Sequence, residues 1–258
     1  MYGIILEVAY DGTDFCGFQL QNNGPTIQGI VEEKLSQMEG RFIRVKGASR
    51  TDSGVHARGQ RIFYTTPHVI PDKGYLRGLN SLLPSSVSIK SVKRTTPDFN
   101  PRKTQGKLYS YSILNRPVHN PFYSRFQWQY LKKLDISLMN QAGKIIEGTH
   151  DFKTFQASDC ERENSTRTMF MVKTVENNGI ITIFVSGNAF LKNMVRIITG
   201  TLVDIGRGHI PLSDLSSIIE ARDRKVGGMT APPHGLCLEK VVYPDEDNST
   251  LYFPSSVD

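Results

Sequence analysis

The residues whose types and spacing suggest chemistry lie in one loop, residues 47–60, between two expected strands. The loop reads Gly-Ala-Ser-Arg-Thr-Asp-Ser-Gly-Val-His-Ala-Arg-Gly-Gln, so Arg50 and Arg58 flank the carboxylate of Asp52. Small residues let a backbone approach a ligand, and loops on a rigid sheet often carry binding or catalytic groups. The loop is therefore a candidate site. The alternative is a plain turn in which Asp52 bonds its own backbone and both arginines are solvated.

Other catalytic and binding motifs do not occur in the sequence. It contains no Gly-x-Ser-x-Gly, no phosphate-binding loop and no Gly-x-Gly-x-x-Gly fingerprint. The six histidines never fall at metal-ligand spacing, and Cys16, Cys160 and Cys237 form no Cys-x-x-Cys pair. We therefore expect no metal site and no disulfide framework.

The composition is that of a mildly basic globular protein. The 258 residues include 31 Lys and Arg against 25 Asp and Glu, a formal net charge of +6, and 38% are hydrophobic. This balance fits a polyanionic partner such as nucleic acid, and equally an ordinary globular protein. No run approaches the roughly 20 apolar residues of a membrane span, and Met1 leads directly into a strand pattern. We expect a cytoplasmic protein that does not bind membranes.

The elements that position the loop follow an α+β pattern. Helix patterns follow the capping residues Thr26, Asp72, Asp135 and Ser213, and a fifth amphipathic pattern covers 190–202. Strand patterns cover 2–9, 42–46, 61–65, 87–92, 108–114, 170–175, 180–186 and 236–243. Asn177-Asn178-Gly179 predicts a hairpin turn. This order is typical of α+β folds with antiparallel or mixed sheets.

The chain is expected to divide near the proline-containing stretch 95–101. We predict an N-terminal α+β half, residues 1–102, which carries the loop. A C-terminal α+β half, residues 103–244, has the same order of strands and helices, and residues 245–258 form a polar tail.

The loop and several further motifs resemble the TruA family of tRNA pseudouridine synthases. Arg50-Thr51-Asp52-Ser53-Gly54-Val55-His56 looks like the signature of that family. Other markers occur in the expected order from residue 10 to about 238: Tyr10-Asp11-Gly12, Thr26-Ile27-Gln28, Tyr109-Ser110-Tyr111, His150-Asp151-Phe152, Met194-Val195-Arg196 and Thr230-Ala231-Pro232. One departure is Ser49, where the family usually has glycine. A positive φ there would strain serine.

The resemblance implies a fold of two similar halves, each a mostly antiparallel or mixed sheet with helices on one face, that face a central basic cleft. It implies isomerisation of uridine to pseudouridine in the anticodon stem-loop of tRNA, at positions 38–40, without metal or organic cofactor. The partners implied are tRNA and a second copy of the chain, as a homodimer. Asp52 matches the essential aspartate of the family. It could attack as a nucleophile or remove a ribose proton to give a glycal, and the sequence leaves both mechanisms open.

Five further residues are implied as substrate-binding residues. Tyr109 matches the active-site tyrosine, whose ring can stack on a flipped base. Arg196 is the candidate cation for the catalytic carboxylate, although an arginine on an amphipathic helix is also an ordinary surface residue. Arg50 is a candidate for contact with the phosphate backbone or for filling the gap left by the extruded base. The weaker candidates for phosphate contacts, each of which taken alone reads as an ordinary solvent-facing residue, are Arg58, Arg102, Lys107 and Lys192. The alternative function is a non-catalytic tRNA-binding or RNA-chaperone module on the same scaffold.

Overall fold

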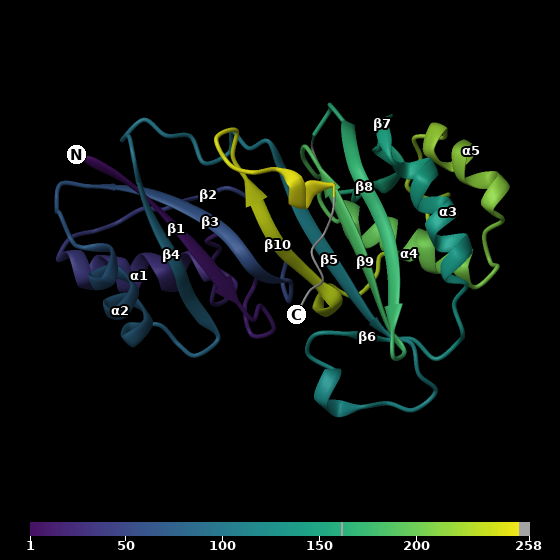
Figure 1. Ribbon diagram of the computed structural model, residues 1–258, viewed down its shortest axis with the longest axis horizontal. Helices are drawn as coiled ribbons and strands as arrows, with labels where there is room; N and C mark the ends of the chain where they lie inside the picture. Colours follow the sequence, from purple (N-terminus) through teal and green to yellow (C-terminus); the bar gives the residue numbers. More distant parts are fainter. Residues whose placement is uncertain (161, 253–258) are drawn as a thin grey trace. The chain divides into compact units, whose positions relative to one another are not determined.

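The computed structural model describes residues 1–160 and 162–252, and the chain forms two compact units (Figure 1). The first unit contains Met1–Thr104 and Cys237–Pro244, and the second contains Gln105–Leu236 and the described residues after Pro244. Both units combine helices with a β-sheet, which confirms the predicted α+β class. Within the described residues, no helix is both long enough and apolar enough to span a bilayer.

The sheet of the first unit has β1 (Tyr2–Tyr10) at its centre. This strand pairs antiparallel with β3 (His56–Thr66) on one side and with β4 (Val87–Thr95) on the other. The short strand β2 (Lys46–Gly47) also pairs with β3. Two helices complete the unit, α1 (Ile27–Glu39) and α2 (Asp72–Leu82), which contact each other.

The last strand, β10 (Leu236–Val242), joins the first unit rather than the second. It runs parallel to β3, with Cys237 opposite His56. The division expected from the sequence placed these residues in the second half because they follow it along the chain. Hydrogen bonding to β3 instead ties them to the first unit.

The sheet of the second unit has the antiparallel order β5 (Gly106–Leu114), β9 (Ile180–Gly187), β8 (Thr166–Asn177) and β7 (Gly148–Asp151). The short strand β6 (Trp128–Gln129) pairs parallel with β5. Asn178 (φ 51°) and Gly179 (φ 74°) connect β8 to β9. Two successive positive φ angles are the geometry of the predicted hairpin turn, which is therefore confirmed.

Three helices belong to the second unit: α3 (Ile136–Ile146), α4 (Met194–Gly206) and α5 (Leu215–Glu220). Helix α3 packs on both β8 and α4. Almost every residue of α4 is buried. Single 3₁₀ turns lie at Pro121–Tyr123, Lys153–Phe155, Leu212–Asp214, Pro233–Gly235 and Ser249–Leu251.

Two of the four predicted caps form as side-chain hydrogen bonds. Thr26 Oγ1 accepts from Gly29 N (3.1 Å), and Asp135 Oδ1 accepts from Leu138 N (3.0 Å). Asp72 instead occupies the first helical position of α2, behind Pro71, and its side chain makes no cap. Ser213 lies inside a 3₁₀ turn, and its hydroxyl donates to Asp214 (2.9 Å) rather than capping α5.

Other differences from the predicted elements have local causes. Helix α4 begins at Met194 rather than at 190, because Asn193 adopts the left-handed region (φ 61°) and interrupts the helical path. The expected strand 42–46 is reduced to the two residues of β2.

The polar tail is packed at Leu251, which is buried and whose carbonyl accepts a hydrogen bond from Ser186 Oγ. Residues 253–258 of the expected tail lie outside the described residues.

A buried carboxylate, Glu39 at the end of α1, links that helix to β3 and α2. It accepts hydrogen bonds from Thr66 Oγ1 (2.6 Å), Tyr75 Oη (3.1 Å) and Tyr64 Oη (3.2 Å), and it lies 3.0 Å from His68 Nδ1. Burial raises the pKa of both Tyr64 and Tyr75. Both phenols therefore stay protonated and act as donors to the carboxylate.

We expect Glu39→Gln to lower the free energy of unfolding by about 1–3 kcal/mol, because the charge-assisted bonds are lost and an amide group faces the hydroxyl donors. Urea denaturation at neutral pH measures this change. Glu33→Gln on the same helix is the control, since Glu33 is exposed and pairs with neighbouring Lys34. Equal stability of the two variants would contradict a structural role for the buried carboxylate.

Candidate active site

The loop that contains Asp52 is held on both sides by buried polar groups. Thr51 Oγ1 lies 2.8 Å from the hydroxyl of Tyr10, and Thr51 O accepts from Phe18 N (3.0 Å). On the other side of the loop, Gln60 Nε2 donates to Ser49 O (2.8 Å). Gln60 is fully buried, so the backbone before Asp52 is fixed to the sheet.

Two glycines let the N-terminal segment pass directly against this loop. A Cβ at Gly17 (φ 90°) would lie 2.6 Å from Thr51 O, and a Cβ at Gly12 would lie 2.0 Å from Val55 O. Any side chain at these positions would clash with the backbone of the loop. The motifs near residues 10–19 and 50–56 therefore form one substructure, although some 40 residues separate them.

Asp52 follows Thr51 in this loop, and its side chain is half-buried. Its carbonyl accepts from Val55 N (3.2 Å) and closes a turn that contains Gly54 at φ 74°. Ser49 is not among the described residues with positive φ, which apart from glycines are Asn178, Asn193 and Arg222. Serine therefore fits the position where the family usually has glycine, without backbone strain there.

Ser53 and His56 have structural partners in this loop. Ser53 Oγ donates to Phe15 O (3.1 Å), and His56 Nδ1 accepts from Gly12 N (3.0 Å). The two side chains thus help to hold the N-terminal segment against the loop.

The two arginines that flank Asp52 in sequence contact other residues. Arg50 Nη1 donates to Gln19 Oε1 (3.2 Å), and Arg58 Nη1 lies 3.2 Å from Glu239 Oε1 on β10. Both arginines are exposed. Their guanidinium groups remain accessible to a polyanion, while Glu239 offsets part of the charge of Arg58.

In the second unit, Tyr109 lies on β5 with its ring edge-on to Phe190, at 5.0 Å between centroids and 77° between planes. Tyr111 follows two residues later and therefore faces the same side of the strand. Tyr111 Oη donates to Pro232 O (2.8 Å), and burial raises its pKa. Tyr111 is thus a fixed structural donor, which leaves Tyr109 as the candidate aromatic residue of this strand.

Arg196 lies in the first turn of α4 with its guanidinium fixed. Its Nε donates to Ala231 O (2.7 Å), and its Nη1 donates to Asn193 Oδ1 (3.0 Å). A Cβ at Gly200 would lie 1.8 Å from Met229 O, so only glycine lets the chain near 229–231 lie against α4. The segments around Arg196 and Ala231 therefore lie against each other, and the Arg196 guanidinium is held by protein groups rather than by solvent.

A cationic cluster, defined here as the buried Lys107 and Arg167 together with the exposed Arg162, lies in the same unit. Lys107 and Arg167 are each 8% exposed. Burial, with the charges of Arg162 and Arg167, lowers the pKa of Lys107 to about 8. Arg167 Nε is buried and has no acceptor among the described residues. Such a cluster favours a negatively charged ligand.

Sequence reasoning found Lys107 but missed Arg167, as well as Gln60 and the carbonyl of Ala231. A signal was present for two of them. Arg167 occupies the same alternating positions of β8 as the buried Met169 and Met171, and Gln60 is a polar residue in a mostly buried strand. For a backbone carbonyl such as that of Ala231, side-chain patterns give no signal.

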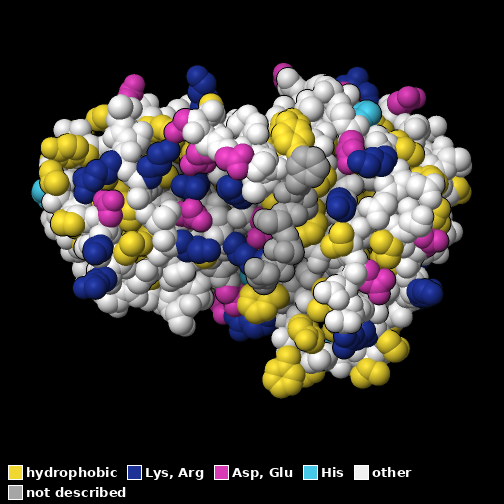
Figure 2. All heavy atoms as spheres, viewed as in Figure 1, with side chains coloured by type: hydrophobic (Ala, Val, Ile, Leu, Met, Phe, Trp, Pro, Cys, Tyr) yellow, Lys and Arg dark blue, Asp and Glu magenta, His cyan; other side chains and the backbone are white. Residues whose placement is uncertain are grey.

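The site residues thus form two groups, each described within its own unit: Asp52, Arg50 and Arg58 in the first, and Lys107, Tyr109 and Arg196 in the second. The basic cleft expected between the halves stays a prediction. On the face shown in Figure 2, basic side chains are interspersed with acidic ones. Among residues 1–160 and 162–252, no group of three or more His, Cys, Asp or Glu residues is arranged to hold a metal ion.

Sequence comparisons with known proteins point to one family. A family profile described as tRNA pseudouridine synthase matches residues 7–102 and 142–244. The chain is 40% identical to the tRNA pseudouridine synthase A of Myxococcus xanthus over 242 residues, which cover 93% of this chain and 91% of that protein. The corresponding protein of Ligilactobacillus salivarius is 41% identical over 247 residues, with coverages of 94% and 96%.

A third relative, the tRNA pseudouridine synthase A of Clostridium acetobutylicum, is 40% identical over 244 residues, covering 94% of this chain and all of that protein. Among solved structures, a chain of a Cbf5-Nop10-Gar1 complex matches with a TM-score of 0.33 and 12% identity, covering 78% of this chain and 45% of that chain. That likeness is too low to support an argument.

Proposed function

Because the chain belongs to the tRNA pseudouridine synthase family, we propose that it isomerises uridine to pseudouridine in the anticodon stem-loop of tRNA. The observation that carries the proposal is the identity of about 40% with curated tRNA pseudouridine synthases over more than nine-tenths of the chain. The fixed loop around Asp52 supports it, because a catalytic carboxylate must be held in one geometry. The proposed location is the cytoplasm, where a tRNA substrate is available.

In the proposed reaction the N1–C1′ bond of the uridine breaks, the uracil rotates, and C5 bonds to C1′. N1 gains a proton and C5 loses one, so no atom enters or leaves overall. The step resembles glycoside chemistry, in which a carboxylate assists a carbon with oxocarbenium character. Asp52 supplies this carboxylate, either as a nucleophile at C1′ or as a base toward the ribose.

The second unit supplies the aromatic ring and the cations. In this proposal Tyr109 stacks on the flipped uracil, and its hydroxyl assists removal of the C5 proton. Arg196 contributes a fixed positive charge to the active site, which favours an ionised carboxylate. Arg50, Arg58 and Lys107 contact the RNA, and the buried charge of Lys107 near Arg162 and Arg167 supports its part in this role.

Incubation of the purified protein with an unmodified tRNA transcript tests the proposal. We expect new pseudouridines at positions 38–40 of tRNAs with uridine there, without added metal or cofactor, as mapped by mass spectrometry of digested RNA. Modification at other uridines would contradict the proposed substrate region. Tight, salt-sensitive tRNA binding without any product would favour the non-catalytic RNA-binding alternative.

We also propose that the protein forms a homodimer, with an exposed apolar loop of the second unit as the candidate interface. The loop, residues 115–134, presents Phe122 (90% exposed), Val118, Phe126 and Leu131 to solvent. Figure 2 shows apolar side chains gathered over the projecting loop that contains Pro121–Tyr123. Exposed apolar groups of this size commonly mark protein–protein contacts.

We expect the double substitution Phe122→Ser and Leu131→Ser to convert the dimer to a monomer at micromolar concentration, because it removes two large exposed apolar side chains of the loop. Light scattering coupled to size-exclusion chromatography measures the mass. Val69→Ser is the control, since Val69 is a comparably exposed apolar residue of the first unit. A doubly substituted protein that stays dimeric places the interface elsewhere, and a monomeric wild type contradicts the homodimer.

A further inference from the structure

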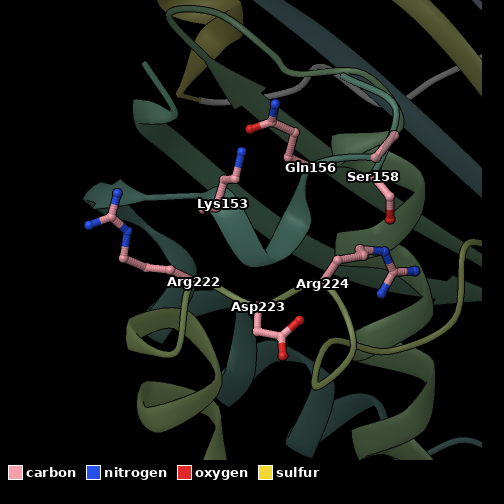
Figure 3. Close-up of a pocket in the computed structure, with 7 residues that line it drawn as sticks. Lys153, Gln156, Ser158, Arg222, Asp223 and Arg224 are labelled. Atoms are coloured by element: carbon pink, nitrogen blue, oxygen red, sulfur yellow. The ribbon is translucent and has the colours of Figure 1, made fainter. Parts of the chain in front are cut away.

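A cationic hollow lies within the second unit, and none of the residues assigned above lines it. Its volume is about 250 Å³, and seven residues line it: Lys153, Gln156, Ala157, Ser158, Arg222, Asp223 and Arg224. In Figure 3, Lys153 and Arg222 lie on one side, Arg224 and Ser158 on the other, and Asp223 between them. Residues 153–158 and residues 222–224 thus both line the hollow.

The cations of this hollow are only partly neutralised. Arg224 donates to two neutral acceptors, Gly227 O (3.3 Å) and Thr230 Oγ1 (2.9 Å), and it forms no ion pair among the described residues. Burial lowers the pKa of Arg224. The ammonium group of Lys153 likewise has no carboxylate partner in the described part of the chain. Two of the three cations therefore lack a counter-charge.

The third cation, Arg222, has a carboxylate partner and an unusual backbone. Its Nε lies 2.9 Å from Asp151 Oδ2 on β7, and much of its side chain remains exposed. Its φ of 52° lies in the left-handed region, where residues other than glycine and asparagine are disfavoured. Asp223, the only acidic lining residue, accepts from Lys225 N (2.9 Å) in its own turn.

Hydrogen bonds connect the hollow to the segment that fixes Arg196. Arg224 binds Thr230, and the next residue, Ala231, accepts from Arg196 Nε (2.7 Å). Ala157, which also lines the hollow, donates its N–H to Lys192 O (3.1 Å), just before α4. An anion in the hollow would therefore bind beside the elements that hold Arg196 in place.

We infer that this hollow binds a backbone phosphate of the substrate RNA. The inference rests on the proposed function, since it requires an RNA that binds near Arg196. A phosphodiester supplies the missing negative charge, and its oxygens can accept from both Lys153 and the arginines. The same chemistry would suit free phosphate, so the test separates the two sources.

The test variant combines Lys153→Gln with Arg222→Asn. Asparagine tolerates the left-handed backbone at 222, and Arg224 is left intact because it holds the segment that fixes Arg196. The control variant combines Lys144→Gln with Lys173→Gln, two exposed lysines of the same unit that lie outside both the hollow and the loop 115–134. Both variants lose two positive charges, so general electrostatics change equally.

We expect the test variant to bind unmodified tRNA about five- to tenfold more weakly than the control at physiological salt. The slope of log Kd against log salt concentration should fall by about one relative to the control, as for one lost phosphate contact. The single-turnover rate at saturating tRNA should stay unchanged, because the hollow does not touch the reacting atoms. Equal affinity and equal slope in the two variants would overturn the inference.

Titration with inorganic phosphate at constant ionic strength distinguishes the sources. Loss of phosphate binding in the test variant, with tRNA affinity and salt slope equal to the control, would assign the hollow to a free anion and overturn the RNA assignment. A wild-type protein that does not bind tRNA at all contradicts the proposed function itself. The two failures are therefore distinguishable.

Discussion

Replacing Asp52 with asparagine or alanine is expected to abolish pseudouridine formation while leaving the fold and tRNA binding nearly unchanged. Both proposed mechanisms need an ionised carboxylate, and neither a neutral amide nor a methyl group can attack C1′ or accept a ribose proton. Thr51, Gln60 and the close contact of the N-terminal segment hold the backbone at this position, so the fold of the loop should persist. We expect a rate loss of about 10²–10⁴-fold or more.

The measurement is single-turnover product formation on unmodified tRNA, with thermal unfolding and tRNA affinity determined for the same preparations. Asp98→Asn is the control, since Asp98 is an exposed carboxylate of the same unit. The alanine variant guards against slow deamidation of asparagine back to aspartate. Normal pseudouridine yield from the alanine variant would remove Asp52 from the mechanism.

Local features of the fold could be predicted because adjacent residues determine them. Thr26 and Asp135 cap helices through a donor three residues away, and the turn at Asn178 and Gly179 depends on two residues that tolerate positive φ. Nothing near Leu236 in the sequence indicates that β10 pairs with β3, which begins some 180 residues earlier. Such long-range pairing depends on how the whole chain packs, and no local pattern records it.

The same limit applies to the candidate site. The family motifs identified Asp52, Tyr109 and Arg196, but not the groups that hold them, such as Gln60 for the loop and Ala231 O for Arg196. The cationic hollow joins Lys153 to Arg222 and Arg224, about 70 residues apart in the sequence. Its charges become a binding site only when the fold brings the two segments together.

The choice between Tyr109 and Tyr111 illustrates how the structure adds to a motif. Because Tyr109 and Tyr111 are two residues apart on β5, both rings face the same side of the strand. From the sequence, only the resemblance to the TruA family favoured Tyr109 over Tyr111. The structure gives a physical reason: the hydroxyl of Tyr111 is fixed on Pro232 O, whereas the ring of Tyr109 lies against Phe190. The two tyrosines should therefore respond differently to substitution.

We expect Tyr109→Phe to bind tRNA nearly as well as the wild type, and Tyr109→Leu to lose about 10²-fold or more in single-turnover rate. Phenylalanine keeps the flat ring and its contact with Phe190, whereas leucine removes stacking worth about 1–3 kcal/mol per base as well as any role of the hydroxyl. The rate of the phenylalanine variant measures the hydroxyl alone. Parallel tRNA affinities separate binding from chemistry.

Tyr111→Phe is the matched control on the same strand. It removes only the hydrogen bond to Pro232 O, so its effect should appear as a loss of about 1 kcal/mol in the free energy of unfolding, with the reaction rate preserved. If Tyr109→Leu and Tyr111→Phe both react as fast as the wild type, neither ring acts on the flipped base. If instead Tyr111→Phe alone loses activity, the motif has been assigned to the wrong tyrosine, because a hydroxyl bound to a backbone carbonyl would then be required for the chemistry.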